Sequence, residues 1–341
     1  MSKGFKNAHH ISNQRLQKEL AVTRIAIIGD IHTHWNQQDV IFFNQSDYDL
    51  LLFVGDLPHL RSMKFNFMEL AKGIGQLEKP AFLIPGNHDC THPVQHLGEI
   101  VGKPIMNTLF ASRQLRKHQA LQKALKGVTV CGYSQHLCTF GDCHFTLIAA
   151  RPHAIGGSRM SFISYLKKQF GIHSLEDSTQ RLKRLIDEAK SQDLVFLAHN
   201  GPFGLGAAAN DIWGADFGSG GDFGDRDLRD AIEYARASGK QVRAVFAGHM
   251  HDIIKAKARS RSTGPRPAER IRFVKEQETY LINPAKVPRI SRSSGELRHH
   301  HVSLVLGPDD CVIQEVFVAN GQIVLTESPT FHQRSFTPRE S

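Results

Sequence analysis

"TRIAIIGDIHTHW", residues 23–35, is an apolar run that stops at a glycine, a carboxylate and a histidine. Continuous apolar runs rich in β-branched residues are typical of strands buried on both faces of a sheet. Here Gly29, Asp30 and His32 follow the run directly, so side chains that can bind ligands stand at its end. The pattern predicts a buried strand whose last residues do more than pack.

Four further runs end in the same way, and helical patterns separate the runs. The runs are "YDLLLFVGDL" (48–57), "KPAFLIPGNHD" (79–89), "DLVFLAHNGP" (193–202) and "RAVFAGHMH" (243–251). The helical patterns cover 66–79, 109–127, 178–192 and 226–240, and this alternation predicts a layered α/β fold. Further strands are expected at 128–134, 143–150, 279–285, 301–307, 311–319 and 322–328. We expect these β-rich C-terminal segments to complete a second sheet rather than to form a separate domain.

Composition excludes several classes of protein. No stretch reaches the roughly 18 to 20 apolar residues of a membrane span, and the N-terminus lacks the apolar core of a secretory signal. We therefore expect a soluble cytoplasmic protein, although the basic N-terminus leaves import into an organelle open. Five scattered cysteines without a C-x-x-C pair indicate reduced thiols. The net charge of +9 favours anionic partners: phosphorylated small molecules, nucleic acid or an anionic membrane surface.

The chain is expected to form one domain, 23–328, between an N-terminal extension (1–22) and a flexible tail (329–341). Within the domain, residues 201–224 form a glycine-rich loop, and long irregular loops are often functional. Residues 255–275 form a basic excursion. It is either a solvated surface loop or a contact for phosphate or nucleic acid, and the sequence favours neither.

The five strand ends together supply a set of metal-binding side chains. Carboxylate, amide oxygen and imidazole suit divalent transition metals, and the absence of thiolates argues against a structural zinc site. One histidine after a strand is usually a capping or packing residue, but five such ends are not explained that way. Because parallel strands end at one edge of a sheet, we expect convergence on one crevice. The residues are Asp30, His32, Asp56, Asn87, His88, His199, His249 and His251.

The ordered strings "GDIH", "GDLPH", "GNHD", "AH" and "GHMH", between residues 29 and 251, resemble the signature of the calcineurin-like metallophosphoesterase superfamily. The resemblance implies a four-layer α/β/β/α sandwich with a two-metal centre. It assigns Asp30, His32 and His251 to one ion and Asn87, His199 and His249 to the other. It also implies that Asp56 bridges the ions, that His88 donates a proton to the leaving oxygen, and that Asp89 orients His88.

The implied reaction is hydrolysis of an anionic phosphate mono- or diester. Two divalent ions, Mn, Fe, Zn or Mg, lower the pKa of a shared water and neutralise charge that builds up on the phosphoryl oxygens. The resulting hydroxide attacks phosphorus, and a protonated histidine assists the leaving group.

The sequence departs from the Ser/Thr protein phosphatases of this superfamily. Those enzymes carry an Asp-Arg pair after the bridging Asp and an Arg before "GNH". In this chain His59 and Leu60 occupy the positions of that Asp-Arg pair, and Pro85 occupies the position of the Arg before Gly86. The expected substrate therefore belongs to the broader group of diesterases, nucleotidases and small-molecule phosphatases. His59 is expected either to contact a metal ligand or to donate a hydrogen bond to the substrate.

A weaker resemblance concerns the glycine-rich loop. "AHNGPFGLG", "IWGADF", "GDFGD" and "YLINPAKVPRI" resemble a poorly characterised group in cyanobacteria and plant plastids. One hypothesis places Asn210, Trp213, Asp216 and Asp222 at the border of the substrate pocket; the alternative is that the loop only packs over the sheet edge. "RHHHVSLVL" (298–306) places three histidines before a strand, where side chains alternate between faces. At most one of them is expected near the centre.

Two alternatives to a small-ester phosphoesterase stay open. The first is a nuclease or nucleotide phosphodiesterase, favoured by the +9 charge and the basic excursion; a polyanionic substrate would lose affinity steeply with salt. The second is a non-catalytic scaffold that keeps the fold. The full set of ligand residues and His88 argues against a scaffold.

Overall fold

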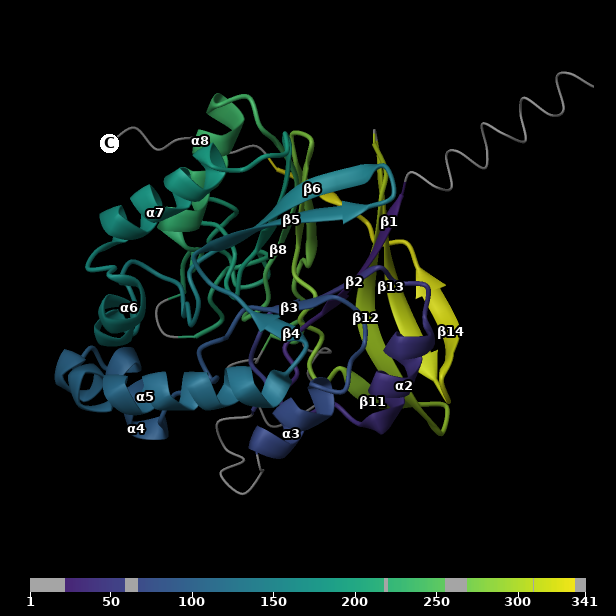
Figure 1. Ribbon diagram of the computed structural model, residues 1–341, viewed down its shortest axis with the longest axis horizontal. Helices are drawn as coiled ribbons and strands as arrows, with labels where there is room; N and C mark the ends of the chain where they lie inside the picture. The colour runs from purple at the N-terminus through teal and green to yellow at the C-terminus, as the bar shows by residue number, and fades with distance from the viewer. Residues whose placement is uncertain (1–21, 59–66, 218–219, 255–268, 309, 335–341) are drawn as a thin grey trace, which may run out of the picture.

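Two sheets face each other in the computed structural model, and helices cover the outer face of each (Figure 1). The structure describes residues 22–58, 67–217, 220–254, 269–308 and 310–334. The four layers confirm the α/β/β/α sandwich. Residues 1–21, His59 and residues 255–268 of the predicted basic excursion lie outside the described residues.

The first sheet has the strand order β14-β13-β12-β1-β2-β3-β4, with β11 paired to β12. Strands β1 to β4 run parallel, whereas β12 lies antiparallel to β1 with Leu304 opposite Ile25. The bounds are β1 Thr23–Ile28, β2 Leu50–Phe53, β3 Ala81–Leu83, β4 Val128–Val130, β11 Ile290–Ser293, β12 Glu296–Leu306, β13 Cys311–Ala319 and β14 Gln322–Glu327.

The second sheet has the order β15-β9-β10-β8-β7-β6-β5. Its central strands β6, β7, β8 and β10 are parallel, whereas β5 and β9 pair antiparallel with their inner neighbours. The bounds are β5 Ser134–Phe140, β6 Cys143–Ala149, β7 Asp193–Leu197, β8 Gln241–Phe246, β9 Phe273–Glu276, β10 Thr279–Ile282 and β15 His332–Arg334.

The C-terminal strands correct one expectation. Instead of completing the second sheet, β12, β13 and β14 extend the first, because β12 pairs along the free side of β1. Of the C-terminal strands that the structure describes, β9, β10 and β15 join the second sheet. Strand β15 falls within the predicted tail and pairs with β9, which itself begins inside the predicted basic excursion.

Four of the helices match the helical patterns of the sequence: α3 Phe67–Ile74, α5 Pro104–Leu125, α7 Leu175–Asp187 and α8 Arg226–Ala237. Three more were not expected, namely α2 Gln37–Gln45, α4 Pro93–Ile100 and α6 Ile163–Phe170. Helix α4 begins with Pro93 in the first turn, and the His92 ring accepts from the Val94 amide. None of the helices that the structure describes is long and apolar enough to cross a bilayer.

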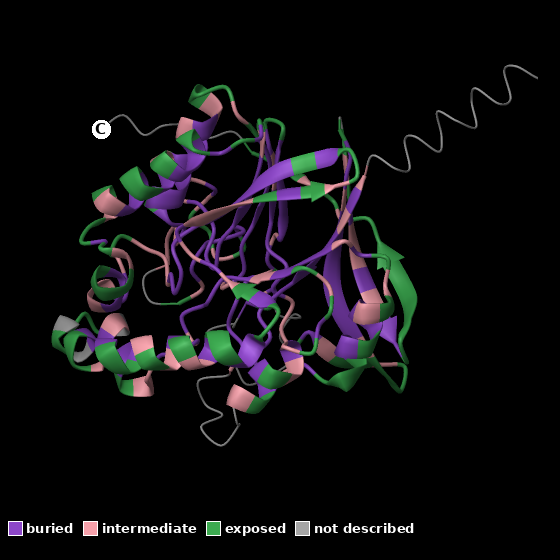
Figure 2. Ribbon diagram, viewed as in Figure 1, coloured by how far each residue is buried: buried purple, intermediate pink, exposed green. Residues whose placement is uncertain are grey.

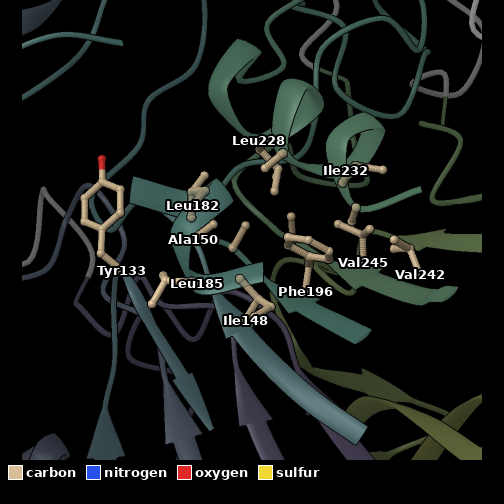
Figure 3. Packing of buried hydrophobic residues seen from close by; sticks show 14 of the residues in the cluster. Tyr133, Ile148, Ala150, Leu182, Leu185, Phe196, Leu228, Ile232, Val242 and Val245 are labelled. Carbon is tan, nitrogen blue, oxygen red and sulfur yellow. The ribbon is translucent and has the colours of Figure 1, made fainter. Parts of the chain in front are cut away.

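Three apolar clusters hold the layers together. Along β1, Ile25 and Ile27 face the second sheet, whereas Ala26 and Ile28 face the cluster under α2, α3 and α5. The third cluster lies beneath α7 and α8 and includes Phe196 of β7 (Figure 3). Burial therefore follows the inner strands and the inward sides of the helices (Figure 2). This two-sided burial explains why the strand sequences are apolar without alternation.

We expect Leu52→Ala to lower the free energy of unfolding by about 2 to 5 kcal/mol, because it opens a cavity between the sheets. Leu109→Ala is the matched control, since Leu109 is 70% exposed and should stay within about 0.5 kcal/mol. Urea unfolding of both variants measures the difference. Equal shifts would contradict the burial of Leu52 between two layers.

Candidate metal centre

The five strand ends meet, but they come from two sheets. Strands β1, β2 and β3 of the first sheet and β7 and β8 of the second all end at the same place. The expected single sheet edge is therefore corrected to the C-terminal edges of two facing sheets. Asp30, His32, Asp56, Asn87, His88, His199, His249 and His251 all lie in these loops.

Asp30, His32 and His251 form the first group of potential ligands. The Nε2 atoms of His32 and His251 lie 3.0 Å apart, and Asp30 Oδ2 lies 3.3 Å from His251 Nε2. Ligands held about 2.1 Å from an ion are roughly 3 to 3.5 Å apart. The spacing of this group fits a single divalent ion.

Asp56, His199 and His249 form the second group, to which Asn87 adds an amide oxygen. Asn87 Oδ1 lies 2.8 Å from His199 Nε2 and 2.9 Å from His249 Nδ1. Asp56 Oδ1 lies 3.5 Å from His199 Nε2. Two nitrogens and two oxygens thus surround one position, a donor set that suits Mn, Fe or Zn.

Asp56 stands between the two groups. Its Oδ1 faces His199 of the second group, and its Oδ2 lies 3.7 Å from His32 Nε2 of the first. The same Oδ2 lies 3.9 Å from His88 Nε2, and Asp56, His32 and His88 form a third possible group. The geometry therefore allows His88 to act either as an acid or as a ligand.

Backbone carbonyls fix the orientation of two histidine rings. The Nδ1 atoms of His199 and His32 lie 2.6 Å and 3.1 Å from the carbonyl oxygens of Val54 and Pro58. If each Nδ1–H donates to its carbonyl, Nε2 keeps its lone pair for a metal ion. Val54 and Pro58 flank Asp56 in the chain, so the bridging loop also positions a ligand of each group.

His96 is a supporting residue that the sequence analysis missed. Its ring is buried on α4, and its Nε2 lies 2.7 Å from Asn87 Nδ2. Burial lowers the pKa of His96 to about 4, which keeps the ring neutral and able to accept from the amide. Asn87 is thereby turned with its oxygen toward His199 and His249. His96 belongs to none of the strand-end motifs, and it lies on α4, a helix that the sequence did not predict.

Asp89 holds the ligand loops together through backbone amides. Its carboxylate accepts from the amides of Gly86 (2.7 Å), Asp56 (2.9 Å) and Leu57 (3.0 Å). These bonds tie the loop after β2 to the loop after β3, and the expected role of Asp89 in orienting His88 stays a prediction. His153, also missed, lies 2.8 Å from the Gly86 carbonyl through Nδ1.

The ligand loops have strained backbones. His32, Asp56 and His249 have φ values of 42°, 52° and 68°, a left-handed region that residues other than glycine rarely adopt. Such strain persists where surrounding structure imposes it, and it is common at functional sites. Gly86 and Gly248 leave no space for a Cβ, because it would overlap the Asp56 and Asp30 carboxylates respectively.

The electrostatics also suit cations. Burial alone would raise the pKa of Asp30, but its hydrogen bond with His251 and the nearby His199 hold it well below its usual range. Burial opposes protonation of His199 and His251, yet the facing carboxylates raise the pKa of both rings. The carboxylates that favour protons on these two rings would also favour a divalent cation, whereas burial lowers the pKa of His32 and His249 and keeps those rings neutral. The residues present therefore fit the metals that the sequence analysis expected.

The residues predicted to border the substrate pocket serve mainly the glycine-rich loop. Trp213 is buried, and its indole N–H donates to the Gly248 carbonyl (3.2 Å). Asp222 accepts from the amides of Gly204 and Gly224. Asn210 is exposed, with its carbonyl accepting from Ile271, and Asp216 lies 3.7 Å from Arg270. The hypothesis that the loop packs over the sheet edge thus explains Trp213 and Asp222.

A cavity of about 370 Å³ is bordered by α4, the 155–162 loop and the glycine-rich loop, and none of the predicted metal ligands lines it. Gly98 lines it from α4, Lys103 from the α4–α5 turn, Arg159 from the 155–162 loop, and Phe223 from the glycine-rich loop. The same loops reach the ligands, since Phe223 accepts from Asn200, the neighbour of His199, and the His153 amide donates to the Pro85 carbonyl. None of the four predicted pocket residues lines this cavity.

The three histidines of β12 have structural roles away from the centre. His299 Nδ1 lies 2.9 Å from Asp39, His301 Nε2 lies 2.8 Å from the Tyr48 hydroxyl, and His300 Nε2 lies 2.8 Å from Glu315. Strand alternation separates the middle ring from the other two, as predicted.

A sequence family model described as calcineurin-like phosphoesterase matches residues 23–252 of this chain. The match covers more than half of the chain and includes every strand end described above. The protein therefore belongs to the calcineurin-like phosphoesterase family, which confirms the resemblance drawn from the motifs. No curated protein matches the chain.

Solved structures with a related arrangement share little sequence. TT1561 of Thermus thermophilus is 10% identical with a TM-score of 0.46, over 86% of this chain and 98% of that one. Vacuolar Protein Sorting 29 from Cryptosporidium parvum is 8% identical with a TM-score of 0.33, over 91% and 100%. A conserved uncharacterised protein of Streptococcus pneumoniae is 10% identical with a TM-score of 0.29, over 88% and 90%.

We expect His96→Leu to weaken metal binding by about 10- to 100-fold, because Asn87 loses the acceptor that fixes its amide. Calorimetric titration with Mn²⁺ and Zn²⁺ measures the change. His118→Leu is the control, since His118 is also buried but contacts the rings of His153 and Tyr165. Unchanged affinity in His96→Leu would exclude this supporting role.

Proposed function

We propose that the protein is a dinuclear metal-dependent phosphoesterase that hydrolyses a phosphate mono- or diester. The observation that carries the proposal is the position of Asp56, whose two oxygens face different groups of ligands. A carboxylate is suited to this place, because an anion with two oxygens can join two cations and reduce their repulsion. Asp30, His32 and His251 would hold one ion, and Asn87, His199 and His249 the other.

Two bound divalent ions would supply an activated water and charge neutralisation at the phosphoryl group. The chain's own residues do the rest. Asp56 holds the two groups together, Asp89 fixes the loops that carry Asp56 and Asn87, and His96 keeps the Asn87 oxygen turned inward. His88, whose side chain is partly exposed, is placed to give a proton to the leaving oxygen.

The organic part of the substrate would occupy the cavity that α4, the 155–162 loop and the glycine-rich loop border. Lys103 and Arg159 offer cationic groups there, and Phe217 and Phe223 offer apolar surface. This mixture suits an anionic ester with an apolar portion better than a phosphoprotein. The sequence supports the same conclusion, since the Arg residues that hold phosphate in the Ser/Thr phosphatases are absent around Pro85.

A nuclease or nucleotide phosphodiesterase is the second candidate. It is favoured by the +9 charge of the whole chain and by a cationic surface around α4 to α6. The same surface also carries exposed aliphatic side chains, which nucleic acid would not contact.

Asp56→Asn should abolish hydrolysis of an aryl phosphate or bis-aryl phosphodiester and lower metal content, because the neutral amide cannot serve both groups. Turnover and elemental analysis of the purified protein measure the two effects. Asp142→Asn, an exposed aspartate in the turn between β5 and β6, is the control and should change neither. Full activity in Asp56→Asn would rule out the bridging assignment.

His88→Ala should reduce turnover by about 10²- to 10⁴-fold while both metals stay bound, as expected for loss of a general acid. His144→Ala, an exposed histidine on β6, serves as control. If His88→Ala loses metal, the third group is a true ligand set and His88 is a ligand instead of the acid.

A further inference from the structure

Helices α4 and α5 and the turn between them expose a stripe of aliphatic side chains. The stripe consists of Val94, Leu97, Val101, Ile105 and Leu109, which are between 41% and 70% exposed. Val94 and Leu97 on α4 are three residues apart, and Ile105 and Leu109 on α5 are four apart, so each pair lies about one turn apart on its own helix. Val101 and Ile105 carry the stripe across the short turn that joins the helices.

The stripe residues do not pack in the core of the domain. The inward sides of both helices are filled by other residues, such as His96 on α4 and Ala111, Leu121 and Leu125 on α5, all of which are buried. Large aliphatic side chains that gather on the surface usually mark a site of interaction. The stripe therefore calls for a partner with an apolar surface.

The surroundings of the stripe are strongly cationic. Residues 93–117 and 158–170 contain seven Lys and Arg (103, 113, 116, 117, 159, 167 and 168) and one acidic residue, Glu99. Glu99 is half-buried, and its carboxylate accepts from the Phe162 amide and the Asn107 side chain. Lys168 donates to Ser112, which joins α6 to α5 (Figure 1). The partner should therefore also be anionic.

We propose that the α4–α5 face docks on an anionic lipid surface. The aliphatic side chains enter the boundary between headgroups and acyl chains, and the surrounding cations contact the phosphates, as in interfacial helices. Nucleic acid fits less well, because single strands are held by aromatic side chains that stack on bases. A second copy of the chain also fits less well, since its own cations would face these.

The cavity shares residues with the same segment of the chain. Gly98, Gly102 and Lys103, which line it, belong to the α4–α5 segment that carries the stripe. An ester whose phosphate stands at a lipid surface would be presented next to the metal centre; this clause alone rests on the proposed function. Docking itself depends only on the surface of α4 to α6.

Co-sedimentation with vesicles tests the inference. The full chain should bind vesicles of phosphatidylcholine with phosphatidylglycerol and should not bind phosphatidylcholine alone. Ile105→Gln combined with Leu109→Gln should reduce binding at least about tenfold, because it removes apolar area that the lipid buries. Arg113→Gln combined with Arg116→Gln should reduce it on the order of 25-fold, at roughly fivefold per charge.

A control replaces two apolar residues that are about half exposed on another part of the molecule. Val312→Gln with Ile323→Gln, on β13 and β14, should bind vesicles as the natural protein does. Urea unfolding checks that every variant is folded. Vesicle binding should persist in Asp56→Asn, so that a failure of the docking proposal can be distinguished from a failure of the proposed catalysis. Three results would overturn the inference: no binding to anionic vesicles, equal losses in the two apolar pairs, or displacement by an oligonucleotide with no effect of the Ile105 and Leu109 changes.

Discussion

Buried carboxylates at the ends of β1 and β2 set the constraint on which the rest of the centre depends. Asp30 and Asp56 are almost fully inaccessible, and burying an unpaired carboxylate costs roughly several kcal/mol. Each is compensated by backbone amides and histidines: the His249 amide donates to Asp30, and the His88 amide to Asp56. The loops after β3 and β8 are therefore held by the same groups that would hold the ions.

The strained backbones follow from this constraint. His32, Asp56 and His249 adopt left-handed conformations because their loops must turn sharply while their side chains point into one small volume. Glycines beside them permit the close approach, and Asp89 fixes two of the loops through three amide bonds. Hydrogen bonds within the chain thus fix the loops that carry the potential ligands.

The strand ends could be predicted from sequence because each is a local pattern, an apolar run followed by a small residue and a ligand. Their division between two sheets could not, since it depends on pairing between distant segments such as β1 and β12. His96 and Asp89 act through contacts made only in the folded state. For Trp213 the sequence left a pocket border and packing both open; the buried indole lies against Gly201, a contact that depends on the folded loop.

Helix α4 lies between three parts of the molecule: the predicted ligand Asn87, the cavity and the exposed surface. Its inward side carries His96, which orients a predicted metal ligand, and Gly98 with Glu99 lines the cavity. Its outward side carries Val94 and Leu97, which the fold leaves exposed. A short helix that begins only five residues after His88 thus reaches both the centre and the surface. A single hydrogen bond, from Asn87 to His96, therefore connects this surface helix to the second group of potential ligands.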